Sequence, residues 1–353
     1  MTTRNIVLLP GDGIGPEVTK AVRTVLEGVS KGHDLSLAFE SHAIGGCAID
    51  ACGDPFPDAT AEACKKADAV FLGAVGGPQW DGGGPRPEAG LLALRQALGT
   101  FANLRPVRLF PGLEHLSPLK PERATGTDML IVRELTGGIY FGAKEEGEQR
   151  ASDLCAYSRH EVERVARIGF DAARSRSGRL TSVDKANVLA SSRLWRKAVV
   201  ALRDAEYPDI ALDHVLVDAM AMKLIERPSA FDVILTENMF GDILSDEASV
   251  IAGSIGLAPS ASLSESHGGL YEPIHGSAPD IAGEGKANPV GAILSGAMLL
   301  RHALGEEAAA AEIETAVARC LADGIGTADI GGSASTTGVA QAVCDRLRTP
   351  VTS

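Results

Sequence analysis

Short apolar runs that end at glycines or polar residues alternate along the chain with stretches whose apolar residues recur at helical spacing. Residues 5–10 are mostly apolar and lead into a G-x-G-x-G sequence at 11–15, after which apolar residues recur through 17–29. This pattern predicts a buried strand, a glycine turn and a helix. Further strands of the same kind are predicted at 69–75, 129–134 and 231–236.

Between these strands the pattern predicts helices and one long loop. Residues 90–98 and 306–322 predict helices, the second amphipathic and at the surface. Pro289 is expected at the first helical position of 290–304, whose near lack of charge predicts burial in a domain core or a subunit interface. Residues 79–89 are rich in glycine and proline, which fits either a flexible surface loop or a lid. The alternation predicts an α/β fold with parallel strands and helices on both faces.

Composition and charge narrow the class of protein. At roughly 150 residues per domain, the 353 residues predict two domains. The 33 Lys and Arg against 46 Asp and Glu give a net charge of −13, which argues against nucleic-acid and anionic-membrane partners. No run approaches the ~18 apolar residues of a membrane span. The first apolar run is also too short for a secretory signal, so we expect a cytoplasmic protein. Six cysteines without a C-x-x-C pair predict free thiols.

Three arginines and three aspartates are candidates for chemistry. Arginine binds carboxylates through two parallel hydrogen bonds, and Arg133, directly after an apolar run, is less easily explained as a surface residue than Arg95 or Arg105. Asp242 and Asp246 share a helix face, where they repel each other unless a cation lies between them.

A metal site competes here with an exposed capping pair. Carboxylates and water suit Mg²⁺ or Mn²⁺, and Asp218, at the end of an apolar run, is a third candidate ligand. Lys185 is either a surface cation or, near a metal, a base. Tyr140 taken alone is expected to be a packing residue.

Several of these segments resemble the isocitrate and isopropylmalate dehydrogenase family, the β-decarboxylating dehydrogenases. The matching motifs lie in family order between residues 5 and 304, and therefore over nearly the whole chain. They are 9–17 (LPGDGIGPE), 103–106 (NLRP), 184–187 (DKAN), 238–246 (NMFGDILSD), 272–283 (EPIHGSAPDIAG) and 287–289 (ANP). The resemblance implies a two-domain α/β dimer that is not a standard Rossmann domain. It implies a cofactor-side domain formed by 1–100 and 253–353, and a dimer-forming domain at 101–252.

The resemblance also implies roles for individual residues. Lys185 would accept the substrate's hydroxyl proton and Tyr140 would help to protonate the enolate formed by loss of CO₂. Asp218, Asp242 and Asp246 would hold Mg²⁺ or Mn²⁺, with Lys185, Asn187 and Asp218 supplied by the neighbouring subunit of a homodimer. The implied substrate-binding residues are Arg95, Arg105, Arg133, Glu88, Leu91, Leu92 and Val188. The implied cofactor-binding residues are His275, Gly276, Ser277, Ala278, Asp280, Ile281, Asn288, Asn187 and Ile14.

Sequence differences within the family then favour one substrate and one cofactor. Ala89 and Leu91 stand where isocitrate enzymes carry the Ser and Asn that bind a third carboxylate, and the aliphatic pair Leu91–Leu92 favours an isopropyl group at ~0.8 kcal/mol per buried carbon. Asp280, where NADP-using relatives carry Lys, favours the free ribose hydroxyl of NAD. We therefore expect NAD-dependent oxidative decarboxylation of 3-isopropylmalate in leucine biosynthesis.

Other activities stay open at this point. D-malate or tartrate oxidation within the same family is the main alternative, because those relatives share the arginines, lysine and aspartates. A metal-dependent acyl or phosphoryl transferase is ranked lower, since it gives Asp280 no role. A catalytically silent binding subunit is also ranked low, since Lys185, Tyr140 and the three aspartates are all present.

Overall fold

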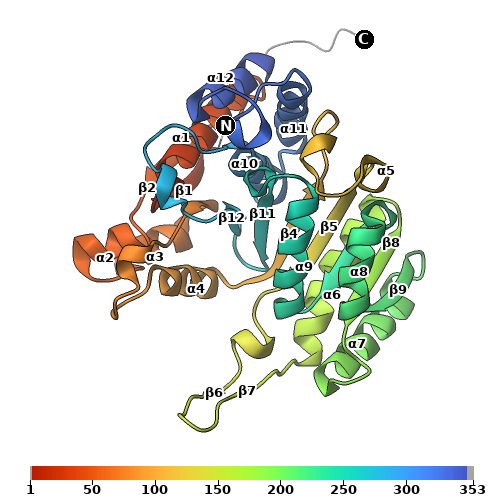
Figure 1. Cartoon of the computed structure of the whole chain (residues 1–353). Coiled ribbons are helices and arrows are strands. Elements are labelled where there is room, and N and C mark those ends of the chain that lie inside the picture. The colour runs from red at the N-terminus through yellow and green to blue at the C-terminus, as the bar shows by residue number, and fades with distance from the viewer. Residues whose placement is uncertain (1, 348–353) are drawn as a thin grey trace. The chain divides into compact units, whose positions relative to one another are not determined.

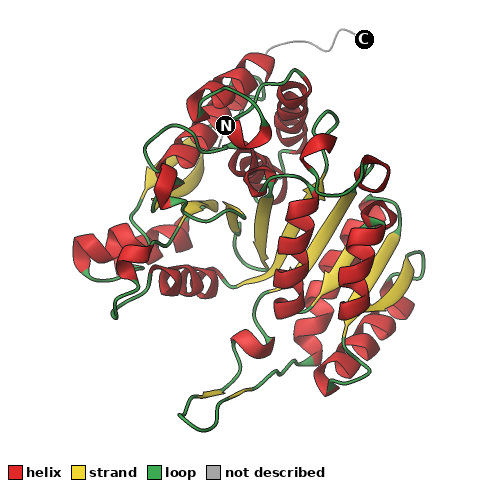
Figure 2. Cartoon of the chain, in the orientation of Figure 1, coloured by secondary structure: helices red, strands yellow, loops and turns green. Residues whose placement is uncertain are grey.

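The computed structural model of the chain describes residues 2–347, which form two compact units (Figures 1 and 2). Unit 1 comprises the chain up to Thr100, Phe110–Leu116 and the chain from Ser254 onward. Unit 2 comprises Phe101–Leu109 and Ser117–Gly253. The sequence had grouped 110–116 with the middle of the chain, whereas this division assigns that segment to unit 1.

Unit 1 contains five neighbouring strands in the order β2-β1-β3-β12-β11, which are parallel except for the antiparallel β11–β12 pair. Its strands are β1 (Arg4–Gly11), β2 (Leu37–Ser41), β3 (Ala69–Ala74), β11 (Pro259–Ser264) and β12 (Leu270–Pro273). Its helices are α1 (Gly15–Ser30), α2 (Gly46–Cys52), α3 (Asp58–Lys66), α4 (Pro87–Leu98), α10 (Val290–His302), α11 (Glu307–Ala322) and α12 (Thr336–Leu347). Short 3₁₀ turns are η1 (Pro78–Trp80), η2 (Glu114–Leu116), η5 (Ile255–Leu257), η6 (Pro279–Ile281) and η7 (Ala328–Ile330).

Helix α10 is the buried helix that the sequence predicted, and it belongs to the core of unit 1. Every residue from 290 to 300 is buried, and the helix packs against α1, α11, β11 and β12 (Figure 1). An apolar helix is stable only when such neighbours surround it. A separate cluster of unit 1 includes Ile44, Cys64, Val70, Leu94 and Leu98, so that α3 and α4 pack together against the strands.

Asp12 fastens three segments of unit 1 at the end of β1. Its buried carboxylate accepts hydrogen bonds from the backbone N–H groups of Gly46 and Cys47, both at 2.8 Å, and of Gly76 at 2.9 Å. The start of α2 and the segment after β3 are thereby held beside the glycine turn. An N–H group removed from water needs an acceptor, and this one carboxylate supplies an acceptor to three of them.

The 79–89 segment begins in a fixed position and continues into a glycine tip. The indole of Trp80 packs closely on Gly46 and donates a hydrogen bond to Asp50 at 3.0 Å. A Cβ atom added at Gly82, Gly83 or Gly84 would have no described atom beyond its chain neighbours within 4 Å, so this part of the loop packs against nothing there. The predicted loop is also shorter than expected, because α4 begins at Pro87, whose fixed φ suits a first helical position.

Unit 2 contains five neighbouring strands in the order β4-β5-β10-β8-β9, and among these pairs only β4–β5 is antiparallel. Helices α6 and α7 pack together, as do α8 and α9, and each pair contacts the strands (Figure 2). The strands are β4 (Thr100–Arg108), β5 (Asp128–Glu134), β8 (Arg179–Asp184), β9 (Ala211–Leu216) and β10 (Val233–Thr236), with a small hairpin of β6 (Lys144–Glu145) and β7 (Ser152–Asp153). The helices are α5 (Pro121–Ala124), α6 (Arg159–Ser175), α7 (Ala190–Glu206), α8 (Val217–Glu226) and α9 (Asn238–Ile251), with 3₁₀ turns η3 (Gly138–Tyr140) and η4 (Pro228–Ala230).

The α/β architecture is confirmed, with two local corrections. The strands are not all parallel as predicted, because β4–β5 and β11–β12 run antiparallel. Pro289 is the N-cap of α10 and not its first helical residue. All six cysteines are free, as expected. Among the described residues, no helix is both long and apolar enough to cross a bilayer.

We predict that Asp12→Ala lowers the free energy of unfolding by about 2–4 kcal/mol, because three N–H groups lose a charged acceptor. Chemical denaturation measures the change. Asp81→Ala is the control, since Asp81 is exposed in the glycine-rich loop, and a change within about 0.5 kcal/mol is expected there. Equal effects of the two variants would contradict the fastening role of Asp12.

Candidate functional site

The antiparallel pairing of β4 with β5 brings two of the predicted arginines to one face of unit 2. Asn103 of β4 lies opposite Arg133 of β5, and Arg105 follows Asn103 by two residues. Residues two apart on a strand share a face, and so do directly opposed residues. The register therefore places Asn103, Arg105 and Arg133 on the same face of the strands, the face that packs against α9.

Both guanidinium groups are buried and contact α9. Arg133 donates from Nε and Nη2 to Asn238 Oδ1, at 3.0 and 2.8 Å, and from Nη1 to Asp242. Arg105 donates to Asn103 Oδ1 at 2.7 Å, Ser245 Oγ at 2.6 Å and Asp246 Oδ1 at 3.3 Å. Close approach is possible because Gly241 has no side chain, and a Cβ there would lie 2.7 Å from Arg133 Cγ.

Tyr140 joins this group through its hydroxyl. The hydroxyl donates to Asp242 Oδ2 at 2.9 Å, and the Arg133 guanidinium lies 5.7 Å from the centre of the ring. Burial and the hydrogen bond to Asp242 raise the pKa of Tyr140, so that the hydroxyl keeps its proton. Tyr140 is 41% exposed, and therefore reachable, which differs from a pure packing residue.

The two aspartates of α9 are held by arginine and not by the end of the helix. Asp242 and Asp246 are the fifth and ninth residues of α9, so neither lies in the first turn, where the helix dipole stabilises a carboxylate. Glu237, which the sequence did not single out, caps the helix by accepting from Phe240 N–H at 3.0 Å. Burial raises the pKa of Asp246, with Arg105 opposing this effect.

Lys185 and Asp218 form a second group in unit 2. Strands β8 and β9 are parallel with Asp184 opposite Leu216, so their carboxyl ends place the next residues side by side. Lys185 Nζ lies 2.8 Å from Asp218 Oδ1, and this hydrogen bond lowers the pKa of the Asp218 carboxyl. The lysine side chain is largely buried and the aspartate is exposed.

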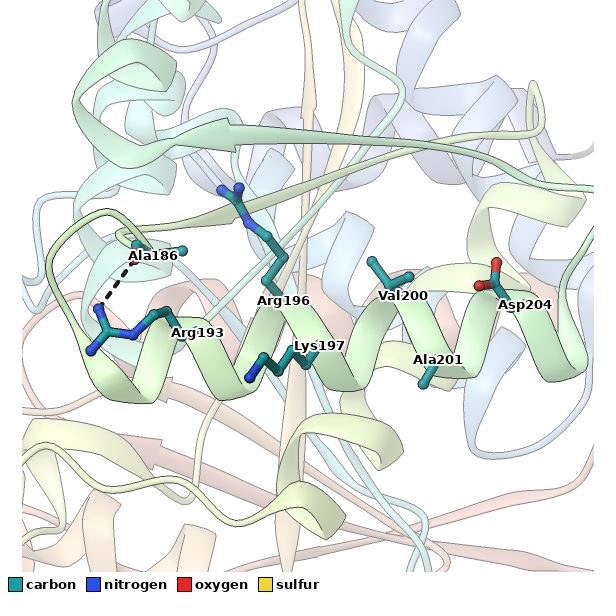
Figure 3. Close-up of a pocket in the computed structure, with 7 residues that line it drawn as sticks. All are labelled: Ala186, Arg193, Arg196, Lys197, Val200, Ala201 and Asp204. Carbon is teal, nitrogen blue, oxygen red and sulfur yellow. Dashed lines mark hydrogen bonds between the residues drawn. The ribbon is translucent and has the colours of Figure 1, made fainter.

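Helix α7 holds the segment that carries Lys185. Arg196 binds the buried Asp184 through two hydrogen bonds of 2.8 Å, and Ser192 Oγ accepts from Lys185 N–H at 3.0 Å. Arg193 donates to the carbonyl of Ala186 at 3.3 Å (Figure 3). Asn187 and Val188, both predicted site residues, are exposed on this segment.

A pocket of about 570 Å³ lies along α7, and none of the residues that line it is a predicted site residue (Figure 3). Three of the residues that line it are basic, and the segment after Lys185 contributes one of the others. They are Ala186, Arg193, Arg196, Lys197, Val200, Ala201 and Asp204.

In unit 1, Arg95 is paired with an internal carboxylate. Its Nη2 donates to Glu272 Oε1 at 2.8 Å, and both side chains are mostly buried. The Arg95 Nε is buried and has no hydrogen-bond partner among the described residues.

Helix α4 presents Glu88, Leu91, Leu92 and Arg95 along one stripe, at spacings of three and four residues. Leu91 packs against the core of unit 1, whereas Leu92 is 50% exposed. The aliphatic patch expected from the pair is therefore formed mainly by Leu92.

The glycine turn packs against one of the segments assigned to the cofactor. Ile14 N–H donates to the Ser277 carbonyl at 2.8 Å, and Gly13, at φ +57°, approaches it so closely that a Cβ would lie 2.0 Å from that oxygen. Ala278 follows at φ +38°, an unusual value for a residue with a side chain. Ala278 leads directly into η6, which carries Asp280, with its exposed side chain, and Ile281.

His275 is buried beside this turn with one ring nitrogen free. Because the Gly276 carbonyl can only accept, Nδ1 donates to it at 2.9 Å, which leaves Nε2 as an acceptor. Burial lowers the pKa of His275, so the ring is neutral at pH 7. Within the described part of the chain, Nε2 has no partner.

Asn288 is held in a network that sequence reasoning missed. Its Nδ2 donates to Asp329 Oδ2 at 2.9 Å, and its Oδ1 accepts from Val290 N–H at 3.0 Å. Asp329 also accepts from the hydroxyls of Ser254 at 2.7 Å and Thr327 at 2.5 Å.

The structure therefore joins Arg105, Arg133, Tyr140, Asp242 and Asp246 in one cluster, and Lys185 with Asp218 in another. The described residues contain no group of three or more His, Cys, Asp or Glu side chains suited to a metal, so the three aspartates do not meet within one chain. Sequence reasoning missed the partners that orient the charged groups, which are Asn103, Asn238, Ser245, Glu272 and Asp329. The signal for Asn103 was its spacing of two from Arg105, and those for Asn238 and Ser245 were their places on the helix of Asp242.

Comparison with known proteins places these features in context. The profile of the isocitrate/isopropylmalate dehydrogenase family matches residues 5–343. The 3-isopropylmalate dehydrogenase of Anaeromyxobacter dehalogenans is 55% identical over 97% of this chain and 99% of its own length. That of Oleidesulfovibrio alaskensis is 58% identical over 92% of this chain and 93% of its own length.

Solved structures give the same picture. The crystal structure of isocitrate dehydrogenase from Methylococcus capsulatus matches 98% of this chain and 100% of its own, with a TM-score of 0.87 and 36% identity. A β-decarboxylating dehydrogenase from Thermococcus kodakarensis matches 98% of this chain and 96% of its own, with a TM-score of 0.82 and 39% identity.

Proposed function

The chain belongs to the isocitrate and isopropylmalate dehydrogenase family, and from that premise we propose that it oxidises and decarboxylates 3-isopropylmalate with NAD⁺. The products are 4-methyl-2-oxopentanoate, CO₂ and NADH, and the step belongs to leucine biosynthesis. The observation that carries the proposal is the cluster in which two buried arginines, a tyrosine hydroxyl and two aspartates meet on α9, in a chain whose 3-isopropylmalate dehydrogenase relatives are 52–58% identical.

The substrate is a dicarboxylate with an apolar branch, and the proposed binding groups match both parts. Arg105 and Arg133 offer buried guanidinium groups to carboxylates, and we assign Arg95 the same role. On the stripe of α4 that ends at Arg95, the exposed side chain of Leu92 offers apolar surface for the isopropyl group. A third carboxylate, as in isocitrate, would find no polar partner at Ala89 or Leu91.

The residues of unit 1 fit a nicotinamide dinucleotide. His275 presents a buried acceptor that has no partner among residues 2–347, which suits an amino group of an adenine ring. The exposed carboxylate of Asp280 suits a ribose that carries a free 2′-hydroxyl and disfavours a 2′-phosphate. NAD is therefore the proposed cofactor, held by the segments around Ile14, 275–281 and Asn288, with Asn187 contributing.

The aspartates fit a divalent cation when two chains combine. Asp242 and Asp246 supply carboxylate oxygens, the donors preferred by Mg²⁺ and Mn²⁺, but the described residues of one chain hold no group of three ligands. Asp218 of a neighbouring subunit completes the proposed set, and brings its partner Lys185 with it.

A homodimer is further favoured by the outer surfaces of α8 and α9. Met222 and Ile225 on α8, and Ile243 and Val250 on α9, are 40–68% exposed although they are large and apolar. The two helices pack against each other in unit 2, so these side chains lie on adjacent elements. Apolar surface concentrated in this way is typical of a protein interface.

The chain's own groups move the protons of the reaction. We assign Lys185, in its unprotonated amine form, the role of taking the proton of the C2 hydroxyl through Nζ. Tyr140 returns a proton through its hydroxyl to C3 after CO₂ has left. The arginines hold the carboxylates so that the reacting bonds stay oriented. When bound, NAD⁺ would supply the hydride acceptor for C2, and the cation would supply a Lewis acid for the C2 oxygen. We place the enzyme in the cytoplasm, where its six free thiols suit a reducing environment.

The reaction itself is tested by NADH formation with Mg²⁺ and 3-isopropylmalate, D-malate, tartrate or isocitrate in parallel assays. We expect the highest kcat/KM for 3-isopropylmalate with NAD⁺. A preference for D-malate or tartrate would keep the chemistry but reject the isopropyl pocket. No reduction of NAD⁺ with any of the four would reject the proposed function.

Lys185→Met is expected to abolish turnover because no proton acceptor remains, while NAD binding, measured by calorimetry, persists.

The same variant tests the shared site when it is co-expressed with Asp246→Asn. A mixed dimer of the two inactive chains contains one intact site, so about a quarter of wild-type activity should return. Each variant expressed alone is the control. Failure to recover activity would show that Lys185 and Asp246 act within the same chain.

Asp280→Lys combined with Ile281→Tyr is expected to shift the preference from NAD towards NADP, because a cation replaces a carboxylate beside the ribose. The ratio of kcat/KM for the two cofactors measures the shift. Glu284→Lys, an exposed change on the same segment, controls for the added charge. An unchanged ratio in the double variant would remove 280–281 from the cofactor site.

A further inference from the structure

Tyr157 lies behind the arginine cluster and contacts the two segments that carry it. The residue precedes α6 and is partly buried, with its ring edge-on to Trp195 at 5.8 Å. The ring rests on Gly137 and Gly138, where a Cβ would lie 2.6 and 2.3 Å from Tyr157 atoms. Gly138 begins the η3 turn that ends at Tyr140, so the tyrosine ring supports this turn directly.

The hydroxyl of Tyr157 reaches the start of α9 from the other side. It donates to Glu237 Oε2 and accepts from Asn238 N–H, both at 3.1 Å. Glu237 is itself buried and caps α9 through its other carboxylate oxygen. Burial, reinforced by the nearby Glu237 and Glu134 carboxylates, raises the pKa of Tyr157, so the hydroxyl remains a donor.

Asn238 passes this positioning on to Arg133. Its Oδ1 accepts from two of the three guanidinium nitrogens, and its Nδ2 donates to the Gly137 carbonyl at 3.3 Å. The plane of the guanidinium is thus set by the position of one amide. That position depends on the backbone N–H bonded to Tyr157. A carboxylate ligand needs a correctly turned fork, because its two hydrogen bonds are parallel.

We infer that Tyr157 is a positioning residue, which sets Arg133 through Asn238 and Tyr140 through Gly137–Gly138, without touching the substrate. The inference rests on the proposed function, because it assigns Arg133 and Tyr140 their roles in binding and proton transfer. Its geometry lies wholly within unit 2. The cofactor segment that includes His275 belongs to unit 1, so the effect is confined to the substrate side.

Tyr157→Phe tests this inference because it removes only the hydroxyl and keeps the ring that packs on the glycines. We expect KM for 3-isopropylmalate to rise, and kcat/KM to fall, by about tenfold, because the hydroxyl's hydrogen bonds to Glu237 and from Asn238 are lost and Arg133 is held less firmly. KM for NAD should stay at the wild-type value. A role limited to stability would not separate the two substrates in this way.

Tyr207→Phe is the matched control. Tyr207, which is buried, is another tyrosine of unit 2 whose hydroxyl bonds a carboxylate, that of Asp171, but its ring stacks on Phe170 and not on the arginine cluster. This variant should lose thermal stability without a change in KM. Equal kinetic effects in Tyr157→Phe and Tyr207→Phe would overturn the inference.

A double-mutant cycle with Asn238→Ala tests the route. If Tyr157 acts through Asn238, the two effects on KM for 3-isopropylmalate combine to less than their product, and full additivity would overturn that route. If Tyr157→Phe does not fold, Asn238→Ala alone decides, by the same split between KM for 3-isopropylmalate and KM for NAD. Wild-type protein that oxidises none of the four acids rejects the proposed function. Wild-type turnover with an unchanged Tyr157→Phe rejects only the positioning role.

Discussion

The charge balance on α9 is the constraint around which unit 2 is organised. Two guanidinium groups are buried between the sheet and a helix, and such groups are tolerated only when they are paired and hydrogen-bonded. Asp242 and Asp246 supply the opposite charges, while Asn103, Asn238 and Ser245 satisfy further N–H groups. The antiparallel β4–β5 pair makes this possible, because its register turns both arginines towards the same helix.

The same strand arrangement explains why the residues that we propose as catalytic lie in two separate clusters. The carboxyl ends of β8 and β9 bring Lys185 to Asp218, whereas β4, β5 and η3 bring the arginines and Tyr140 to α9. Neither cluster needs a bound ligand to balance its charges, so the chain can fold without substrate. Formation of the proposed homodimer then brings Lys185 and Asp218 of one subunit to the α9 cluster of the other.

Much of the fold could be predicted from the sequence, but few of the hydrogen bonds and ion pairs that position the site residues could be. Apolar runs predicted β1, β3, β5, β10 and the buried helix α10, because buried elements require apolar residues at regular positions along the chain. The antiparallel pairs were missed, since strand direction depends on partners far along the chain. Motifs identified the family, which the comparisons confirm. The Glu272 partner of Arg95 and the Tyr157 contacts depend on tertiary packing, and no local spacing encodes them.

For the carboxylate binding that we propose at Arg95, the Arg95–Glu272 pair implies an exchange of partners. In the free chain the guanidinium already holds an internal carboxylate at 2.8 Å, so an incoming carboxylate must share or displace it. The contribution expected from this proposed contact is therefore the difference between two ion pairs and not the full strength of either. Because dissolved ions screen both pairs alike, this contact contributes little ionic-strength dependence. Selectivity here becomes a competition, which favours acids whose remaining atoms gain additional contacts.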